Sequence, residues 1–365
     1  MTILIFIFIL AVLIFVHELG HFAVAKLSGV RVDEFALGFP PKVFSFKYGE
    51  TTYALNIIPF GGYVKIFGEN PDEESISGPD KGRSLIGKPR HIQAAVLVAG
   101  VACNLLLAWL LFTTAFIVGF PFSADHVKDF TYAEKTVVIS GVFPDSPASG
   151  VIVPGDTLMY VRNLSGDKIT VRKPEEMTSV IDRIAPRPVK LGILSKGQEE
   201  IAEVSIKPSQ NIIEGKWALG IGFEEVAVIK APWYKAIWLG LTTTAETTTG
   251  MFFGLADLAQ RVWQGTSVSE LVVGPVGIAG MVGDARSLGL VYLITFTAFI
   301  SVNLAVLNIL PFPALDGGRL AVIFIESIIR MPISPKITNA LNLAGFALLI
   351  AFMLFVTWGD VMRLF

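Results

Sequence analysis

The chain of 365 residues carries 29 basic and 31 acidic side chains, so its formal net charge is only −2. This balance gives no reason to expect a nucleic-acid partner. Hydrophobic residues make up 53% of the chain and charged residues only 16%, against roughly 25% charged residues in soluble proteins. Together with a mean hydropathy of +0.63, this composition indicates an integral protein of the lipid bilayer. The single cysteine, Cys103, excludes an intrachain disulfide and a multi-cysteine metal site.

Four stretches are apolar enough to cross a bilayer, which takes about 20 helical residues. Residues 1–16 contain no ionisable side chain. They lack the basic start and the small-residue cleavage site of a signal peptide, so we expect a retained transmembrane helix. The other three stretches cover about 92–120, 288–310 and 341–357. The predicted fold class is a polytopic α-helical membrane protein with four transmembrane helices.

The first apolar stretch runs into His17-Glu18-Leu19-Gly20-His21. On a helix, His17 and His21 lie one turn apart on the same face, so both imidazoles can reach one metal ion. Glu18 is then close enough to take a proton from a water at that metal, as in the HExxH motif of zinc proteases. The alternative is a chance match with histidines that make only structural hydrogen bonds. Because ionisable groups are costly in a membrane helix, we favour the functional interpretation.

A β-hairpin is predicted after the first helix. Residues 44–47 and 51–57 alternate in polarity around a Tyr48-Gly49-Glu50 turn, and 59–62 reads as a flexible loop. We expect this hairpin to be membrane-associated, on the side of the HExxH motif. An edge strand of it can pair with an extended peptide. The alternative is a hairpin that only covers the site.

The region between the second and third stretches has ordinary soluble composition. Short alternating runs at 189–194 and 200–206 predict strands of a globular domain. Residues 233–258 are helical in pattern but include charged and threonine-rich positions. We interpret 233–258 as an amphipathic helix on the membrane surface. A fifth crossing there would place the ends of the first and third stretches on opposite sides of the bilayer.

A third metal ligand is predicted at the end of the third stretch, in Asn308-Ile309-Leu310-Pro311-Phe312-Pro313-Ala314-Leu315-Asp316-Gly317-Gly318. The prolines interrupt the helix and the glycines let the backbone turn. Asp316 then lies at the depth of the HExxH motif. Two histidines and a carboxylate leave one tetrahedral position for water, as in catalytic zinc sites. The alternative is an ordinary turn with a solvated Asp316.

Basic residues predict the orientation of the helices. They are frequent in 26–90 and recur after the third stretch at Arg319 and Arg330. The positive-inside rule places both segments on the cytoplasmic face. The two termini and the central domain are then extracytoplasmic.

The HELGH and NILPFPALDGG segments, with the architecture between them, resemble the site-2 protease family of intramembrane zinc metalloproteases. The match is best to its bacterial branch, which includes the regulator of sigma-E protease. Further segments that resemble the family are Gly29-Val30-Arg31-Val32 with Gly38-Phe39, Pro59-Phe60-Gly61-Gly62-Tyr63-Val64 and Gly274-Pro275-Val276-Gly277-Ile278. The resemblance implies Zn²⁺ bound by His17, His21 and Asp316, with Glu18 as general base.

The resemblance also implies substrate-binding residues. Asn104 ends a GxxxN pattern that starts at Gly100, and it is expected to bind the substrate carbonyl or the developing oxyanion, or else to tie two helices together. Asn308 is expected either to hold the substrate backbone or to pack helices. Gly61, Gly62 and Tyr63 of the glycine-containing segment are expected to contact substrate.

The central region resembles a PDZ domain. Gly141-Val142-Phe143-Pro144-Asp145-Ser146-Pro147-Ala148, followed by Pro154-Gly155-Asp156-Thr157-Leu158, matches its signature, and 174–184 its helix. We expect one extracytoplasmic α+β PDZ domain at 136–208. The flanking regions are then 1–120 with two membrane helices and the hairpin, 209–287 with a linker and amphipathic helices, and 288–365 with the last two membrane helices. This domain either binds a substrate C-terminus or excludes proteins with bulky outside domains.

The resemblance implies an endopeptidase of the bacterial inner membrane. Its substrates are then single-span membrane proteins, such as anti-sigma factors or signal-peptide remnants, cut within or near the transmembrane segment. The alternative is a non-proteolytic PDZ-containing membrane receptor or metal-handling protein. Glu18 argues against it, because a binding or transport site needs no proton acceptor beside the ligands. Close relatives often have two PDZ domains and a histidine after LDGG, whereas this chain has one such domain and Arg319.

Overall fold

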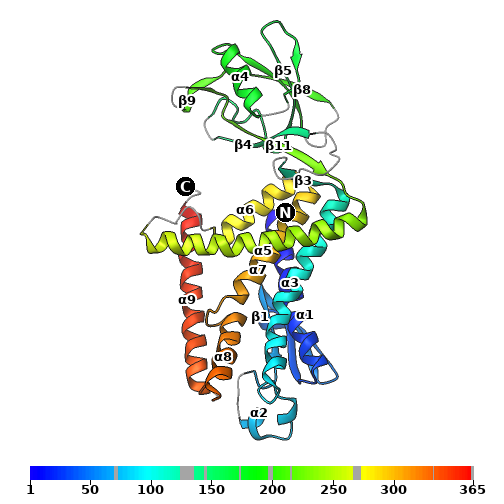
Figure 1. Ribbon diagram of the computed structural model, residues 1–365, viewed down its shortest axis with the longest axis vertical. Coiled ribbons are helices and arrows are strands. Elements are labelled where there is room, and N and C mark those ends of the chain that lie inside the picture. Colours follow the sequence, from blue (N-terminus) through cyan, green and yellow to red (C-terminus); the bar gives the residue numbers. More distant parts are fainter. Residues whose placement is uncertain are drawn as a thin grey trace. The chain divides into compact units, whose positions relative to one another are not determined.

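The structure is a computed structural model. It describes residues 1–69, 73–123, 135–143, 146–171, 174–195, 200–213, 216–265, 273–331 and 333–362. The chain divides into two compact units (Figure 1). The first comprises 1–113, 237–283 and 294–365, and the second comprises 114–236 and 284–293.

In the described part of the chain, four helices are long and apolar enough to cross a membrane. They are α1 (Thr2–Leu27), α3 (Arg90–Val118), α7 (Leu290–Ile309) and α9 (Pro335–Met362). The prediction of four apolar helices of spanning length is confirmed. The first span is longer than expected, because α1 continues past His21 to Leu27. The HExxH motif therefore lies inside the helix and not at its end.

The third span stops where the prolines predict. Helix α7 ends at Ile309, before Pro311, and a further helix, α8 (Asp316–Ile329), starts at Asp316. A side chain at Gly317 would overlap the carbonyl oxygens of Ile309 and Leu310, so this tight return of the backbone requires glycine. The sequence predicted the turn but not α8, which occupies the expected link.

A bent hairpin follows α1. Strands β1 (Val32–Tyr48) and β2 (Thr51–Ile66) meet at a turn at Gly49, which confirms the predicted hairpin. Both strands bend, so that 32–37 pairs with 52–55 and with 62–66, while 42–48 pairs with 51–56. Among the described residues, 42–48 and 62–66 are the two edges of this sheet.

The prediction of a flexible loop at 59–62 is wrong, because these residues belong to β2. The strand bends there instead of ending. Gly61 has a φ of 106°, which only glycine adopts readily. Gly61 thus allows β2 to bend where the sequence predicted a loop. The residues after this bend, 62–66, form an edge of the sheet.

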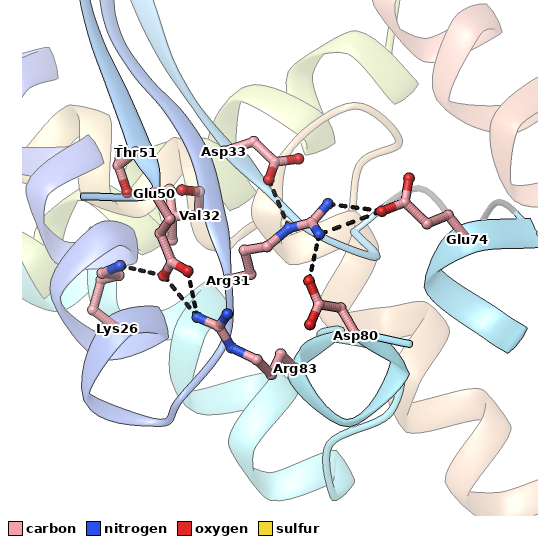
Figure 2. Close-up of polar contacts among 9 residues, drawn as sticks. All are labelled: Lys26, Arg31, Val32, Asp33, Glu50, Thr51, Glu74, Asp80 and Arg83. Atoms are coloured by element: carbon pink, nitrogen blue, oxygen red, sulfur yellow. Dashed lines mark hydrogen bonds and ion pairs between the residues drawn. The ribbon is translucent and has the colours of Figure 1, made fainter. Parts of the chain in front are cut away.

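Arg31 joins the sheet to the segment that leads into α3. This segment contains α2 (Glu73–Ser77) and a 3₁₀ turn, η1 (Lys81–Arg83). The Arg31 guanidinium donates hydrogen bonds to Asp33 at 2.9 Å, to Asp80 at 2.7 Å and to Glu74 at 3.3 Å (Figure 2). It also lies 3.6 Å from the centre of the Phe67 ring. A planar guanidinium can satisfy several carboxylates and stack on a ring at once, which an ammonium cannot.

Glu50 at the hairpin turn joins α1 to the same segment. Its carboxylate accepts hydrogen bonds from Lys26 at 2.6 Å and from Arg83 at 2.7 and 2.6 Å (Figure 2). These hydrogen bonds to Lys26 and then Arg83 lower the pKa of Glu50 from its usual value.

A lowered carboxylate pKa stabilises the folded state above the pKa of the unfolded chain, about 4.3. That stability is lost as the pH falls through the lower pKa of the folded state. We therefore expect Glu50→Gln to lower the melting temperature near neutral pH, with a free-energy cost of up to about 1 kcal/mol for such partly exposed pairs. The difference from wild type should vanish in acid. Thermal unfolding of the detergent-solubilised protein between about pH 3 and 7 measures this, with exposed Glu246→Gln as control. A constant difference across that range would contradict the assignment.

Two more helices belong largely to the first unit, α5 (Trp233–Trp263) and α6 (Pro275–Leu288). Helix α5 is not among the four candidate spans, and it runs crosswise to α9 in Figure 1. The Trp109 indole of α3 donates a 2.9 Å hydrogen bond to the Ile237 carbonyl. Asp360 of α9, only 5% exposed, accepts hydrogen bonds from the amides of Gly274 and Gly277 at 3.1 and 2.8 Å. This carboxylate caps the positive end of α6.

The second unit contains a seven-stranded sheet with strand order β3-β11-β4-β5-β7-β8 and β6 beside β5. Its strands are β3 (Phe120–Ser123), β4 (Lys135–Val142), β5 (Thr157–Arg162), β6 (Lys168–Ile169), β7 (Val189–Leu194), β8 (Ile201–Ile206) and β11 (Ile221–Ile229). A separate pair comprises β9 (Ser209–Ile213) and β10 (Lys216–Ala218).

One helix, α4 (Pro174–Ile184), packs into the core of this unit through Met177 and Ile181, with Leu191 of β7. The predicted helix at 174–184 and the predicted strands at 189–194 and 200–206 are confirmed. Strands β3 and β11 join the sheet from outside 136–208. Pro144 and Asp145 of the PDZ-like signature lie outside the described residues.

Candidate active site

The two histidines of the HExxH motif face each other on α1. Their Nε2 atoms are 3.1 Å apart, and both residues are 7% exposed. The Nδ1 atom of His21 lies 2.8 Å from the Val96 carbonyl oxygen of α3. A carbonyl accepts only, so His21 carries its proton on Nδ1 and directs the lone pair of Nε2 toward His17. This is the arrangement that orients a metal-ligating histidine.

Asp316 at the start of α8 completes a three-residue cluster with these histidines. Its Oδ2 atom lies 3.1 Å from His17 Nε2 and 3.3 Å from His21 Nε2. Ligand atoms about 2.0–2.1 Å from a tetrahedral zinc ion lie about 3.3 Å from each other. The spacing of the three donor atoms therefore fits zinc, as does the combination of two imidazoles and a carboxylate.

Glycines bring α1 and α3 together at this cluster. A side chain at Gly100 of α3 would overlap the His21 ring, and its Cβ would lie 2.8 Å from His17 Cε1. A side chain at Gly20 of α1 would overlap the Ala99 carbonyl of α3. Gly100 is thus the position of the GxxxN pattern that leaves room for both imidazole rings.

Glu18 shares a cavity of about 660 Å³ with the three clustered residues. The cavity is lined by the α1 motif, by 62–64 and Ile66 of β2, by 314–316 and Arg319 at the start of α8, and by residues of α9. The Glu18 carboxylate accepts a hydrogen bond from the Val64 amide of the edge strand. The edge strand 62–66 thus lies directly beside the carboxylate of the motif.

The structure divides the predicted substrate-binding residues. Gly62 and Tyr63 line the cavity, and Asn308 Nδ2 lies 3.3 Å from His17 Nε2. Gly61 is not among the lining residues and faces the Phe39 ring. Asn104 is 0% exposed, does not line the cavity and contacts His17 from the other side, at Nδ1. The expected contact between Asn104 and substrate therefore does not fit this geometry.

Some residues that line the cavity are not among those predicted from the sequence. Glu69, just after β2, forms an ion pair with Arg319. Asn339 and Asn342 of α9 also line the cavity, and Asn342 accepts a 3.4 Å hydrogen bond from the Ala314 amide. The two asparagines lie three residues apart at the start of an apolar span, and polar residues in a membrane helix are a signal that could have marked them. No local pattern links Glu69 to Arg319.

An HExxH helix that meets a distant aspartate within a group of apolar helices defines a class of protein, the membrane-embedded metalloproteases. The model of peptidase family M50 matches residues 5–352. A Clostridium perfringens protein with the provisional name of a zinc metalloprotease is 37% identical over 350 residues, 96% of this chain and 95% of its own. The regulator of sigma-W protease RasP of Bacillus subtilis is 27% identical over 441 aligned positions, which cover 100% of this chain and 99% of RasP.

A Fusobacterium nucleatum protein, also provisionally named a zinc metalloprotease, is 32% identical, with both chains covered completely. The chain therefore belongs to peptidase family M50, the site-2 protease family. It is a bacterial membrane protein and a site-2 type metalloprotease with zinc as its cofactor.

Proposed function

We propose that the protein is an endopeptidase that cuts single-span membrane proteins within or near their transmembrane segment. In this proposal His17, His21 and Asp316 bind the zinc ion and Glu18 is the general base. The observation that carries it is the spacing of the three donor atoms, 3.1–3.3 Å, with Glu18 in the same cavity.

The residues suggest how hydrolysis proceeds. When bound, zinc supplies a Lewis acid for the scissile carbonyl and lowers the pKa of water toward about 7. Glu18 takes the proton of the attacking water and delivers it to the leaving amine. Asn308, whose amide already points at His17 Nε2, is placed to donate a hydrogen bond to the oxyanion that develops on the scissile carbonyl.

We propose anti-sigma factors or signal-peptide remnants as the substrate class. One support is the name of the Bacillus subtilis relative, a regulator of sigma-W protease. The test is cleavage of several such segments, with destabilised helices, by the reconstituted protein, with the cut positions mapped. We expect chelator-sensitive cuts inside the segments. An absence of chelator-sensitive hydrolysis in all of them would refute the proposal and would favour a non-proteolytic receptor or metal-handling protein.

A transmembrane substrate must unwind before it is cut, and its freed backbone groups cost several kcal/mol each if unpaired in lipid. We propose that edge strand 62–66, with Gly62 and Tyr63, pairs with the extended substrate. The Val64 amide points toward Glu18, which indicates that this edge faces the cavity. Because amides alternate along a strand, those of Gly62 and Ile66 point the same way.

We therefore expect Gly62→Pro and Ile66→Pro to lower kcat/KM for membrane substrates by at least about tenfold, since each removes an amide on the pairing side. Cleavage assays alongside zinc analysis measure this. The matched control is Ser45→Pro on the other edge of the same sheet, which should cleave at the wild-type rate. Unchanged cleavage by both edge-strand variants would leave the sheet only the role of a cover.

We propose that residues 136–208 form a PDZ domain that acts as a size filter. In this division of the chain, the membrane regions are 1–120 and 288–365, and the linker region is 209–287. Support comes from α4 and β7, which lie where the signature requires them. A filter predicts that a bulky outside domain fused to a substrate blocks its cleavage. Equal cleavage of the substrate with and without the fused domain would favour the alternative, in which the PDZ domain binds a substrate C-terminus.

We also propose the topology that the basic residues indicate, in the bacterial inner membrane. The termini and the PDZ domain are extracytoplasmic, the site lies toward the cytoplasm, and α5 lies on the membrane surface. Exposed Trp233, Trp238 and Trp263 on α5 suit the lipid headgroup region. A cysteine introduced at Tyr48 should react with an impermeant reagent only from the cytoplasmic side. Reaction from the outside would reverse the assignment.

A further inference from the structure

Asn104 is wholly buried and has an unusual set of contacts. It lies on α3, one turn after Gly100, and its Nδ2 atom is 3.3 Å from His17 Nδ1. Its backbone carbonyl accepts a 2.8 Å hydrogen bond from the Ser301 hydroxyl of α7. Within the described part of the chain, its side-chain oxygen Oδ1 is buried without a hydrogen-bond partner. A buried carbonyl oxygen without a hydrogen-bond partner is unfavourable, so the orientation of this amide calls for an explanation.

The chemistry of His17 supplies the explanation. His17 directs Nε2 to Asp316 and His21, so it can ligate zinc only through that nitrogen. A neutral imidazole that ligates through Nε2 carries its proton on Nδ1, and that proton needs an acceptor. The amide nitrogen of Asn104 cannot accept it. The amide oxygen can, once the amide group is turned by 180°, a rotation that leaves the shape of the side chain unchanged.

The turned amide places an acceptor at His17 Nδ1. Oδ1 then accepts the proton of His17 Nδ1, and the amide nitrogen takes the buried position that Oδ1 leaves. His17 then donates a hydrogen bond from Nδ1 to Asn104, just as His21 donates one from Nδ1 to the Val96 carbonyl. Each zinc-facing histidine is then held by an acceptor on α3, and the two halves of the GxxxN pattern serve the two imidazoles, Gly100 by making room and Asn104 by bonding.

We propose that Asn104 is a positioning residue that holds His17 as a zinc ligand by accepting its Nδ1 proton. This inference rests on the zinc ligands named under the proposed function. It replaces the expectation that Asn104 contacts substrate. Outer partners of metal-ligating histidines are worth 10–100-fold in metal affinity, so the effect is measurable without any substrate.

The test is zinc affinity of the full-length protein in detergent, measured by competition with a chelator. Asn104→Leu keeps the size of the side chain but removes the acceptor, and we expect affinity to fall by about 10–100-fold. Asn104→Asp keeps an acceptor, so it should bind zinc at least as tightly as wild type. The matched control is Asn303→Leu, another asparagine of a membrane helix, whose amide bonds the Phe299 carbonyl. It should bind zinc like wild type.

The outcomes separate this inference from the proposed function. If wild type and His17→Ala bind zinc equally, the proposed ligand set itself is wrong. If His17→Ala loses zinc but Asn104→Leu keeps wild-type affinity, only the inference about Asn104 is overturned. Weak binding by Asn104→Asp, equal to that of Asn104→Leu, would overturn it as well, because the acceptor would not matter. Should Asn104→Leu fail to accumulate in membranes, Asn104→Ala provides the same comparison.

Discussion

Glu18→Gln should abolish cleavage of membrane substrates while zinc stays bound at one ion per chain. Glutamine preserves the size of the side chain and can still accept the hydrogen bond from the Val64 amide, but it cannot take a proton from water. General bases contribute about 10²–10⁴-fold to rate, and a loss of that size in kcat is expected. KM should change little, because Glu18 makes its main contribution in the transition state.

The matched control for this variant is Glu69→Gln, which removes a carboxylate from the same cavity. The Glu69 carboxylate pairs with Arg319, so most of the activity should remain. Cleavage assays and zinc analysis on the same preparations decide the matter. Retention of more than a tenth of the wild-type kcat by Glu18→Gln would exclude Glu18 as the general base. Loss of zinc from that variant would make Glu18 a ligand instead.

The features that the sequence predicted well are those encoded locally. Apolar stretches of spanning length located α1, α3, α7 and α9 because the bilayer imposes their length and composition. The i, i+4 spacing of His17 and His21 is a property of one helix, so the pair could be predicted without knowledge of the tertiary structure. Asp316 was found by a depth argument that joins two spans, and the structure brings its carboxylate to both imidazoles.

The features that the sequence did not reveal depend on distant contacts. Glycine permits both a loop and a bend, so the sequence of 59–62 predicts a loop although β2 continues through it. The caps and pairs that join Asp360 to Gly274, and Glu69 to Arg319, connect residues far apart in the chain, and no short pattern encodes them. The GxxxN pattern marks Asn104, but only the structure shows which side of His17 it contacts.

Asp316→Ala should cost the protein its zinc. The site then retains two imidazoles from one helix, and we expect zinc affinity to fall by more than about 100-fold, beyond the effect of any outer partner. Because the proposed ligands come from α1 and α8, we expect zinc to stabilise the contact between these helices as well as the site. Bound ligand stabilises the folded state by RT ln(1 + [L]/Kd). Chelator should therefore lower the melting temperature of wild type but leave that of Asp316→Ala unchanged.

Asp360→Asn provides the control, because it replaces a different aspartate, a buried one, in the same unit. Its carboxylate caps α6 through the amides of Gly274 and Gly277, so the variant should unfold at lower temperature yet bind zinc and respond to chelator like wild type. The comparison of the two variants then distinguishes a loss of stability from a loss of zinc. If Asp316→Ala bound zinc as tightly as wild type, or if both aspartate variants lost zinc alike, the third ligand would have to be sought elsewhere, and the two ends of the chain would not share one metal ion.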